Sequence, residues 1–166
     1  ETLRRYLEVL DQKSQRLKNL TEDLVEASRA SSGNISLQLE RINFVELVKQ
    51  ACGEFSEKFM ERELTPVTSF PEYSLHVIAD GRRVWRILEN LFQNTKKYAM
   101  PGTRVYISVT ELEGYATFVM KNISESELNI TPEELTERFT RGDASRTTEG
   151  SGLGLSIAKS LTEIQG

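Results

Sequence analysis

The segment EGSGLGLSIAKS, from Glu149 to Ser160, places a run of glycines before an apolar, helix-like stretch. Such a run suits anion binding, because the backbone can approach a phosphate closely and the first free N–H groups of the helix point toward it. A flexible turn before an ordinary helix has the same pattern, so both interpretations stay open here. The P-loop pattern is excluded because Lys159 follows Ala158. The dinucleotide-binding pattern is excluded because Leu155 stands where a glycine is required.

Composition narrows the class of protein. The chain has 166 residues, of which 38% are hydrophobic and 28% charged, as in a soluble globular domain with an appended element. The net charge of −4, without a long basic run, argues against nucleic acid as a partner. No apolar run is long enough to span a membrane and no signal-peptide pattern opens the chain, so we expect no membrane contact by these residues. We expect the single cysteine, Cys52, in the core and the single histidine, His76, as a structural residue of a strand.

A leucine heptad predicts one long N-terminal helix. Leucines recur at Leu3, Leu10, Leu17 and Leu24, and the companion series is weakened by Ser14, Thr21 and Ser28. Because such a helix cannot bury its stripe alone, we expect partner helices.

The remaining pattern predicts an α+β domain. Capping residues place helix starts at Asn43, Asp80 and Thr131, the first helix running to about Glu63 and the second to about Ala99. Residues 35–43 form a short strand or an extended linker, and alternating apolar residues predict strands within 64–70, 73–79, 103–112 and 115–122. The last two meet in a hairpin at 113–114, and a last helix starts near Gly152.

The predicted helix over 80–99 carries the most informative polar residues. Its apolar stripe consists of Val84, Ile87, Leu88, Leu91 and Tyr98. Asn90, Asn94 and Lys97 follow one flank of this stripe at helical spacing. They form either a solvated edge or the polar wall of a pocket, in which a carboxamide oxygen could bind Mg²⁺ and the lysine could meet phosphate.

Three motifs of this sequence resemble those of sensor histidine kinases. ENLFQNTKKYA at 89–99 resembles their N box, ERFTRGDASR at 137–146 their F box, and GSGLGLSIAKS at 150–160 their second glycine box, in the family's order and spacing. The resemblance implies a Bergerat-type α/β sandwich, a mixed sheet backed by helices with a mobile ATP lid. It also implies a division into a second dimerisation helix at 1–31, a linker or short strand at 32–43, and a catalytic ATP-binding domain at 44–166 that is truncated at its C-terminal end.

The resemblance also implies roles for individual residues. Asn94 matches the asparagine that binds Mg²⁺, Lys97 a phosphate-contacting lysine, and Arg141 the arginine that reaches the γ-phosphate of ATP; these three are the expected catalytic residues. The other expected nucleotide-binding residues are Asn90, Tyr98, Asn122, Phe139, Gly150, Ser151, Gly152, Leu153, Gly154 and Leu155. The glycine segment is then both a hinge of the lid and a phosphate cradle.

The sequence departs from the family in three places. The acceptor histidine of the first dimerisation helix is not in the sequence, so we expect ATP binding without self-labelling on His76. Asn122, Ile123 and Ser124 stand where the family has Asp-x-Gly, so we expect adenine binding that persists but is weaker or slower. The chain also stops before the family's final strands, and both ends are expected to be cut.

The implied function is transfer of the γ-phosphoryl group of ATP to a histidine on a dimerisation helix, for relay to an aspartate of a response regulator. The implied partners are a second copy, paired through the long helix, and a receiver domain; the implied location is the cytoplasmic portion of a membrane-anchored sensor. Two alternatives stay open: another ATPase of the same superfamily, of chaperone or mismatch-repair type, and an interaction module that has lost nucleotide binding.

Overall fold

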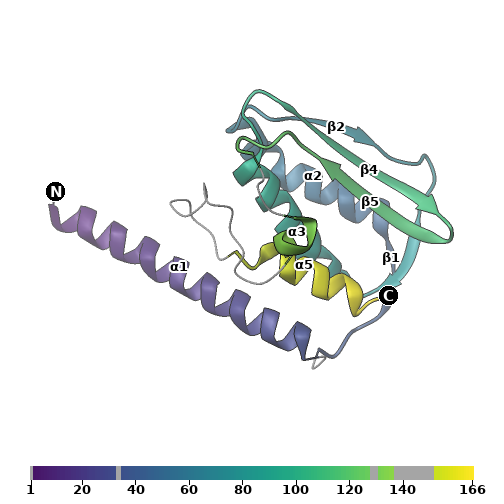
Figure 1. Cartoon of the computed structure of the whole chain (residues 1–166), viewed down its shortest axis with the longest axis horizontal. Coiled ribbons are helices and arrows are strands. Elements are labelled where there is room, and N and C mark those ends of the chain that lie inside the picture. Colours follow the sequence, from purple (N-terminus) through teal and green to yellow (C-terminus); the bar gives the residue numbers. More distant parts are fainter. Residues whose placement is uncertain (1, 33–34, 128–130, 137–151) are drawn as a thin grey trace.

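The computed structural model describes residues 2–32, 35–127, 131–136 and 152–166. A long helix lies along one side of a sandwich of helices and sheet (Figure 1). The elements in chain order are α1 (Thr2–Ser31), β1 (Glu40–Asn43), α2 (Phe44–Met60), β2 (Thr65–Ser69), β3 (His76–Ala79), α3 (Gly81–Tyr98), β4 (Arg104–Leu112), β5 (Tyr115–Lys121), α4 (Pro132–Thr136) and α5 (Gly154–Glu163). The expected α+β class, with a long preceding helix, is confirmed.

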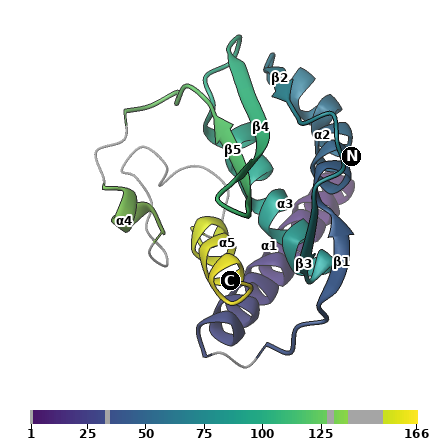
Figure 2. The same cartoon turned by 90° about the vertical axis from the view of Figure 1, so that its right-hand side faces the viewer.

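The strands form two sheets within the described residues. In the three-stranded sheet β2 pairs in parallel with β4, and β4 pairs antiparallel with β5, so this sheet is mixed as expected. The β4–β5 turn occurs at Glu113 and Gly114, which adopt positive φ angles of 52° and 82°, as a two-residue hairpin requires. Strands β1 and β3 form a separate antiparallel pair (Figure 2).

Local signals fixed most element boundaries. Asp80 caps α3 by accepting hydrogen bonds from two backbone N–H groups of its first turn. Thr131 and Glu134 form the reciprocal capping box that opens α4. At α2 only half of the predicted box forms: Asn43 accepts from the Glu46 N–H at 3.4 Å, while the Glu46 carboxylate binds Lys49.

Two predicted boundaries are off by a few residues. Helix α2 ends at Met60 rather than near Glu63, which adopts a positive φ of 55°. Helix α5 begins at Gly154 rather than near Gly152, since Gly152 is itself left-handed with a φ of 73°.

The main core lies between α2, α3 and the three-stranded sheet. Phe55, Phe59 and Phe92 form its aromatic centre, with the Phe92 ring centroid 5.1 Å from that of Phe55 and 5.7 Å from that of Phe59. The predicted inward face of β4 is buried at Val105, Ile107 and Val109. Cys52 packs against this core half-buried, and burial raises the pKa of its thiol. His76 is on a strand as predicted, but its side chain is exposed.

The single apolar stripe predicted for α3 was incomplete. Phe92 and Thr95 lay outside that stripe and are buried. Helix α3 is covered on two sides: Phe92 faces the main core, whereas Ile87 packs against a second cluster built by α5. A helix between two layers buries more than one stripe, which explains the discrepancy.

The second cluster joins α1 to the sandwich. Ala27 of α1 packs with Leu153, Ile157 and Leu161 at and within α5. The heptad leucines at the other end of α1 are exposed, Leu3 to 73% and Leu10 to 65%. The predicted heptad face of α1 is therefore not covered by the rest of the described chain, and a partner helix could pack against it. In the described part of the chain, no helix has both the length and the apolar content that a membrane crossing needs.

Candidate functional site

The N-box helix and the glycine segment meet at Asn90. The Asn90 side chain is buried and its Nδ2 donates a hydrogen bond to the Arg86 carbonyl at 3.0 Å. A Cβ added to Gly154 would lie 3.2 Å from Asn90 Oδ1, so the backbone of Gly154 lies directly against this amide. Two motifs more than sixty residues apart in the sequence thus lie in contact.

Asn94 follows one turn further along α3 and is half-buried. Within the described residues its carboxamide makes no hydrogen bond, so its oxygen is available to a ligand. Lys97 and Tyr98 occupy the last turn, where the Lys97 Nζ lies 4.7 Å from the centroid of the Tyr98 ring. The polar flank expected on this helix is therefore present.

Helix α5 begins without a side-chain cap. Leu153 is the N-cap residue and makes no capping hydrogen bond through its side chain, which is buried among apolar residues. The N–H groups of the first turn, including those of Gly154 and Leu155, lack partners inside their own helix, as at every helix start. Together with left-handed Gly152, they form a backbone arrangement suited to an anion.

The segment 122–125, which we call the strap, lies beside the end of α3. The Ile123 carbonyl accepts a hydrogen bond from the Met100 N–H at 2.8 Å, and the Glu125 N–H donates to the Tyr98 carbonyl at 2.8 Å. Ser124 forms a β-bridge with Ala99. Asn122, at the start of the strap, is exposed. The strap thus lies close in space to the turn that carries Lys97 and Tyr98.

Four of the expected site residues lie outside the described residues: Phe139, Arg141, Gly150 and Ser151. Their roles stay predictions.

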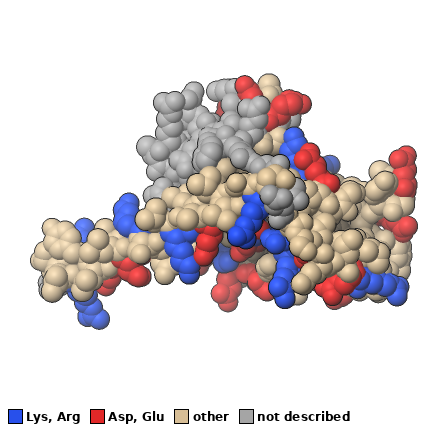
Figure 3. Space-filling model, turned by 90° about the horizontal axis from the view of Figure 1, so that it is seen from below, with Lys and Arg blue, Asp and Glu red and all other residues tan. Residues whose placement is uncertain are grey.

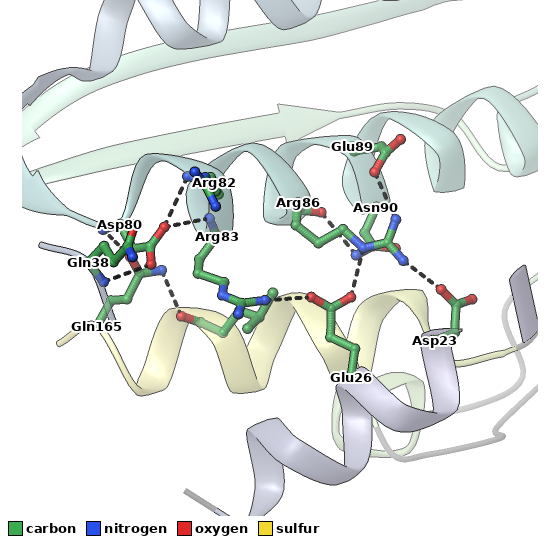
Figure 4. A network of polar contacts seen from close by, with 11 residues as sticks. Asp23, Glu26, Gln38, Asp80, Arg82, Arg83, Arg86, Glu89, Asn90 and Gln165 are labelled. Atoms are coloured by element: carbon green, nitrogen blue, oxygen red, sulfur yellow. Dashed lines mark hydrogen bonds and ion pairs between the residues drawn. The ribbon is translucent and has the colours of Figure 1, made fainter. Parts of the chain in front are cut away.

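A network of ion pairs that the motifs did not indicate connects α1 to α3 (Figure 4). Arg86 binds Asp23, Glu26 and Glu89, and Arg83 binds Glu26 at 3.1 Å. Burial by itself lowers the pKa of Arg86, but its hydrogen bonds to Glu89 and Glu26 outweigh burial and raise it. The sequence does contain a signal for this network: an acidic pair, Asp23 and Glu26, and a basic pair, Arg83 and Arg86, with the two members of each pair three residues apart on one helix.

A second junction surrounds the buried Asp80 carboxylate. It accepts hydrogen bonds from the backbone N–H groups of Gln38, Arg82 and Arg83 at 3.0 to 3.2 Å. The Asp80 N–H in turn donates to Gln165 Oε1 at 2.8 Å. Burial alone would raise the pKa of Asp80, but the backbone donors outweigh burial and lower it. The Asp80 carboxylate therefore connects the segment after α1 to the start of α3. The Asp80 backbone N–H connects the same position to Gln165.

Charges alternate on the surface that α1 belongs to. On the face shown in Figure 3, Lys and Arg are interspersed with Asp and Glu rather than gathered in one basic patch.

Known proteins resemble this chain over most of its length. A family described as "Histidine kinase-, DNA gyrase B-, and HSP90-like ATPase" matches residues 79–166. The signal transduction histidine-protein kinase BaeS of Escherichia coli is 29% identical over 149 residues, which are 89% of this chain and 32% of BaeS. The sensor protein VanSC of Enterococcus gallinarum is 30% identical over 98% of this chain and 45% of VanSC. This chain therefore spans less than half the length of these relatives.

Solved structures show the same fold. Full-length ShkA in complex with AMPPNP matches 97% of this chain and 34% of its own with a TM-score of 0.81 and 22% identity. The histidine kinase ThkA in complex with the response regulator TrrA matches 99% of this chain and 45% of its own with a TM-score of 0.66 and 22% identity.

The chain belongs to the family of histidine kinase-, DNA gyrase B- and HSP90-like ATPases. Within that family, its relatives identify it as the ATP-binding catalytic domain of a two-component sensor histidine kinase.

Proposed function

We propose that this domain binds ATP between α3, the start of α5 and the strap, and transfers the γ-phosphoryl group to a histidine on a dimerisation helix. The observation that carries the proposal is the contact between Asn90 and Gly154, because it joins the N box to the second glycine box. The family membership and the AMPPNP complex of the similar ShkA support ATP as the ligand.

Each described residue has a role that its position suits. The first N–H groups of α5 and the left-handed Gly152 would hold phosphate oxygens. Lys97 would add positive charge at the phosphates, and Tyr98 would lie beside the nucleotide. We assign Arg141 to the γ-phosphate and Phe139, Gly150 and Ser151 to the nucleotide from the motif alone. Phosphoryl transfer requires mainly such positioning and charge.

The residues fit Mg²⁺. Asn94 presents a carboxamide oxygen with no hydrogen bond inside the described chain, and carboxamide oxygens are suitable ligands for this cation. No group of three His, Cys, Asp or Glu side chains among the described residues could hold a metal, so the ion would share its coordination with substrate phosphates and water. When bound, Mg²⁺ would neutralise charge on the phosphates of the substrate.

The remaining expectations are part of the same proposal. Residues 1–31 would pair with a second copy, 32–43 would connect, and 44–166 would be the catalytic domain. The exposed heptad leucines of α1 support this pairing. A receiver domain would take the phosphoryl group onto an aspartate. The complex of the similar ThkA with a response regulator supports such a domain as the partner. We place the domain in the cytoplasmic portion of a membrane-anchored sensor.

Calorimetric titration with AMPPNP, with and without Mg²⁺, tests the proposal. We expect binding that strengthens with Mg²⁺ and loses that gain in Asn94→Ala, with wild-type affinity in the absence of the metal. Absence of binding under both conditions would overturn the proposal and favour the interaction module. In a parallel incubation with labelled ATP, we expect no label on His76, since this exposed strand residue matches no acceptor motif.

A further inference from the structure

Arg62, just after α2, contacts two other segments of the chain. Its Nε donates to the Lys96 carbonyl at 3.2 Å and its Nη2 donates to the Ala99 carbonyl at 3.2 Å. The same Nη2 binds the Glu125 carboxylate of the strap at 3.0 Å. One guanidinium therefore joins the end of α2, the end of α3 and the end of the strap.

The two carbonyls are those that a helix end leaves without partners. The last carbonyls of a helix lack intrahelical N–H donors and carry the negative end of its dipole. A guanidinium satisfies both needs at once, because its planar fork donates in several directions. Arg62 thus fixes the turn of α3 that carries Lys97 and Tyr98.

The strap is held to that turn by few interactions. Its backbone makes two hydrogen bonds, one between the Met100 N–H and the Ile123 carbonyl and one between the Glu125 N–H and the Tyr98 carbonyl. The Glu125 side chain adds the ion pair with Arg62. The strap begins at Asn122, which stands where the proposed site meets adenine. Loss of the Arg62–Glu125 contact would therefore leave the strap held to α3 by its backbone alone and would loosen it, without touching the phosphate cradle.

We propose that Arg62, through Glu125, is a positioning residue for the adenine side of the nucleotide site. It holds the strap and the last turn of α3 at a fixed separation, and so selects the base while the phosphates bind elsewhere. This inference rests on the proposed function. The Arg62–Glu125 pair is partly exposed, at 32% and 53% of its side-chain surfaces, so its effect on affinity is modest.

The test compares AMPPNP with GMPPNP, which carry the same triphosphate on different bases. The main variant is Glu125→Gln, because it removes the ion pair and leaves both bonds of Arg62 to the α3 carbonyls in place. We expect AMPPNP binding to weaken about threefold to fivefold, with GMPPNP binding unchanged. Arg62→Ala should weaken AMPPNP by about tenfold, and Arg62→Lys should restore part of that loss.

The matched control is Glu61→Gln. Glu61 pairs with Lys96 at 3.6 Å in the same region, has no hydrogen bond or ion pair to the strap among the described residues, and should leave both affinities unchanged. Equal losses for both nucleotides in Glu125→Gln would mean a merely structural role, and unchanged AMPPNP binding would mean none; either result overturns the inference. If Arg62→Ala does not fold, Glu125→Gln decides. If the wild type binds no AMPPNP, the proposed function has failed as well, so the two failures are distinguishable.

Discussion

The backbone of Gly154 lies against the side chain of Asn90, so that a methyl group on Gly154 would meet Asn90 Oδ1 at 3.2 Å. Asn90 cannot easily yield, because it is buried and holds the Arg86 carbonyl through its Nδ2. The glycine is therefore required by packing as well as by its proximity to the proposed phosphate site.

We expect Gly154→Ala to lower the free energy of unfolding by about 1 kcal/mol, through crowding against Asn90. In an Asn90→Ala background the same change should be neutral or stabilising, because space is available and alanine favours the helix. Urea denaturation of the four proteins of this cycle measures the coupling.

Gly53→Ala is the control for helix propensity. Gly53 lies inside α2, and a Cβ there has no neighbour within 4 Å, so this change should stabilise the protein by about 0.5–1 kcal/mol. An equal gain from Gly154→Ala in the wild-type background would contradict the packing argument.

Asn122→Asp should tighten AMPPNP binding about tenfold, because an ionised acceptor makes a stronger hydrogen bond to the adenine amino group than a neutral amide. Calorimetry in the presence of Mg²⁺ measures the change. Ser126→Asp, which adds the same charge at an exposed position just beyond the strap, should leave the affinity unchanged. Unchanged or lost affinity in Asn122→Asp would argue against this assignment.

Glu26→Gln should destabilise the protein by about 1–3 kcal/mol, because it removes the carboxylate that binds both Arg83 and Arg86 in a partly buried site. The Glu26 side chain is only 18% exposed. Urea denaturation measures the loss. Glu22→Gln on the same helix removes an exposed pair with Lys18 and should cost less than about 0.5 kcal/mol. Equal costs for the two variants would show that the junction between α1 and α3 adds no stability.

The buried Asp80 carboxylate makes the free energy of unfolding depend on pH in the acidic range. Its pKa is lowered in the folded state, so its contribution is present above the unfolded pKa of about 3.9 and is lost as pH falls through the folded value. Asp80→Asn should therefore cost about 1 kcal/mol at pH 7 and progressively less below about pH 4. Urea titrations at pH 7 and pH 3 measure this difference. A cost that stays constant or grows in acid would contradict the assignment.

Elements whose signals lie within a few residues of one another could be predicted from the sequence. Asp80 capped α3, Thr131 and Glu134 closed a reciprocal box, and the Glu113-Gly114 pair made the hairpin. The three motifs also identified the family. Their glycines and amides recur at fixed spacing because the backbone N–H groups must come close to a phosphate.

Contacts between residues far apart in the sequence could not be predicted and became visible only in the folded chain. Phe92 is buried because α3 has neighbours on two sides, and no single helical stripe could show this. Arg86 binds Asp23 and Glu26 about sixty residues earlier, and Arg62 reaches Glu125 about as far ahead. Such pairs depend on how whole helices pack, because a charged side chain on an exposed-looking helix face has the same local pattern whether it meets solvent or a partner.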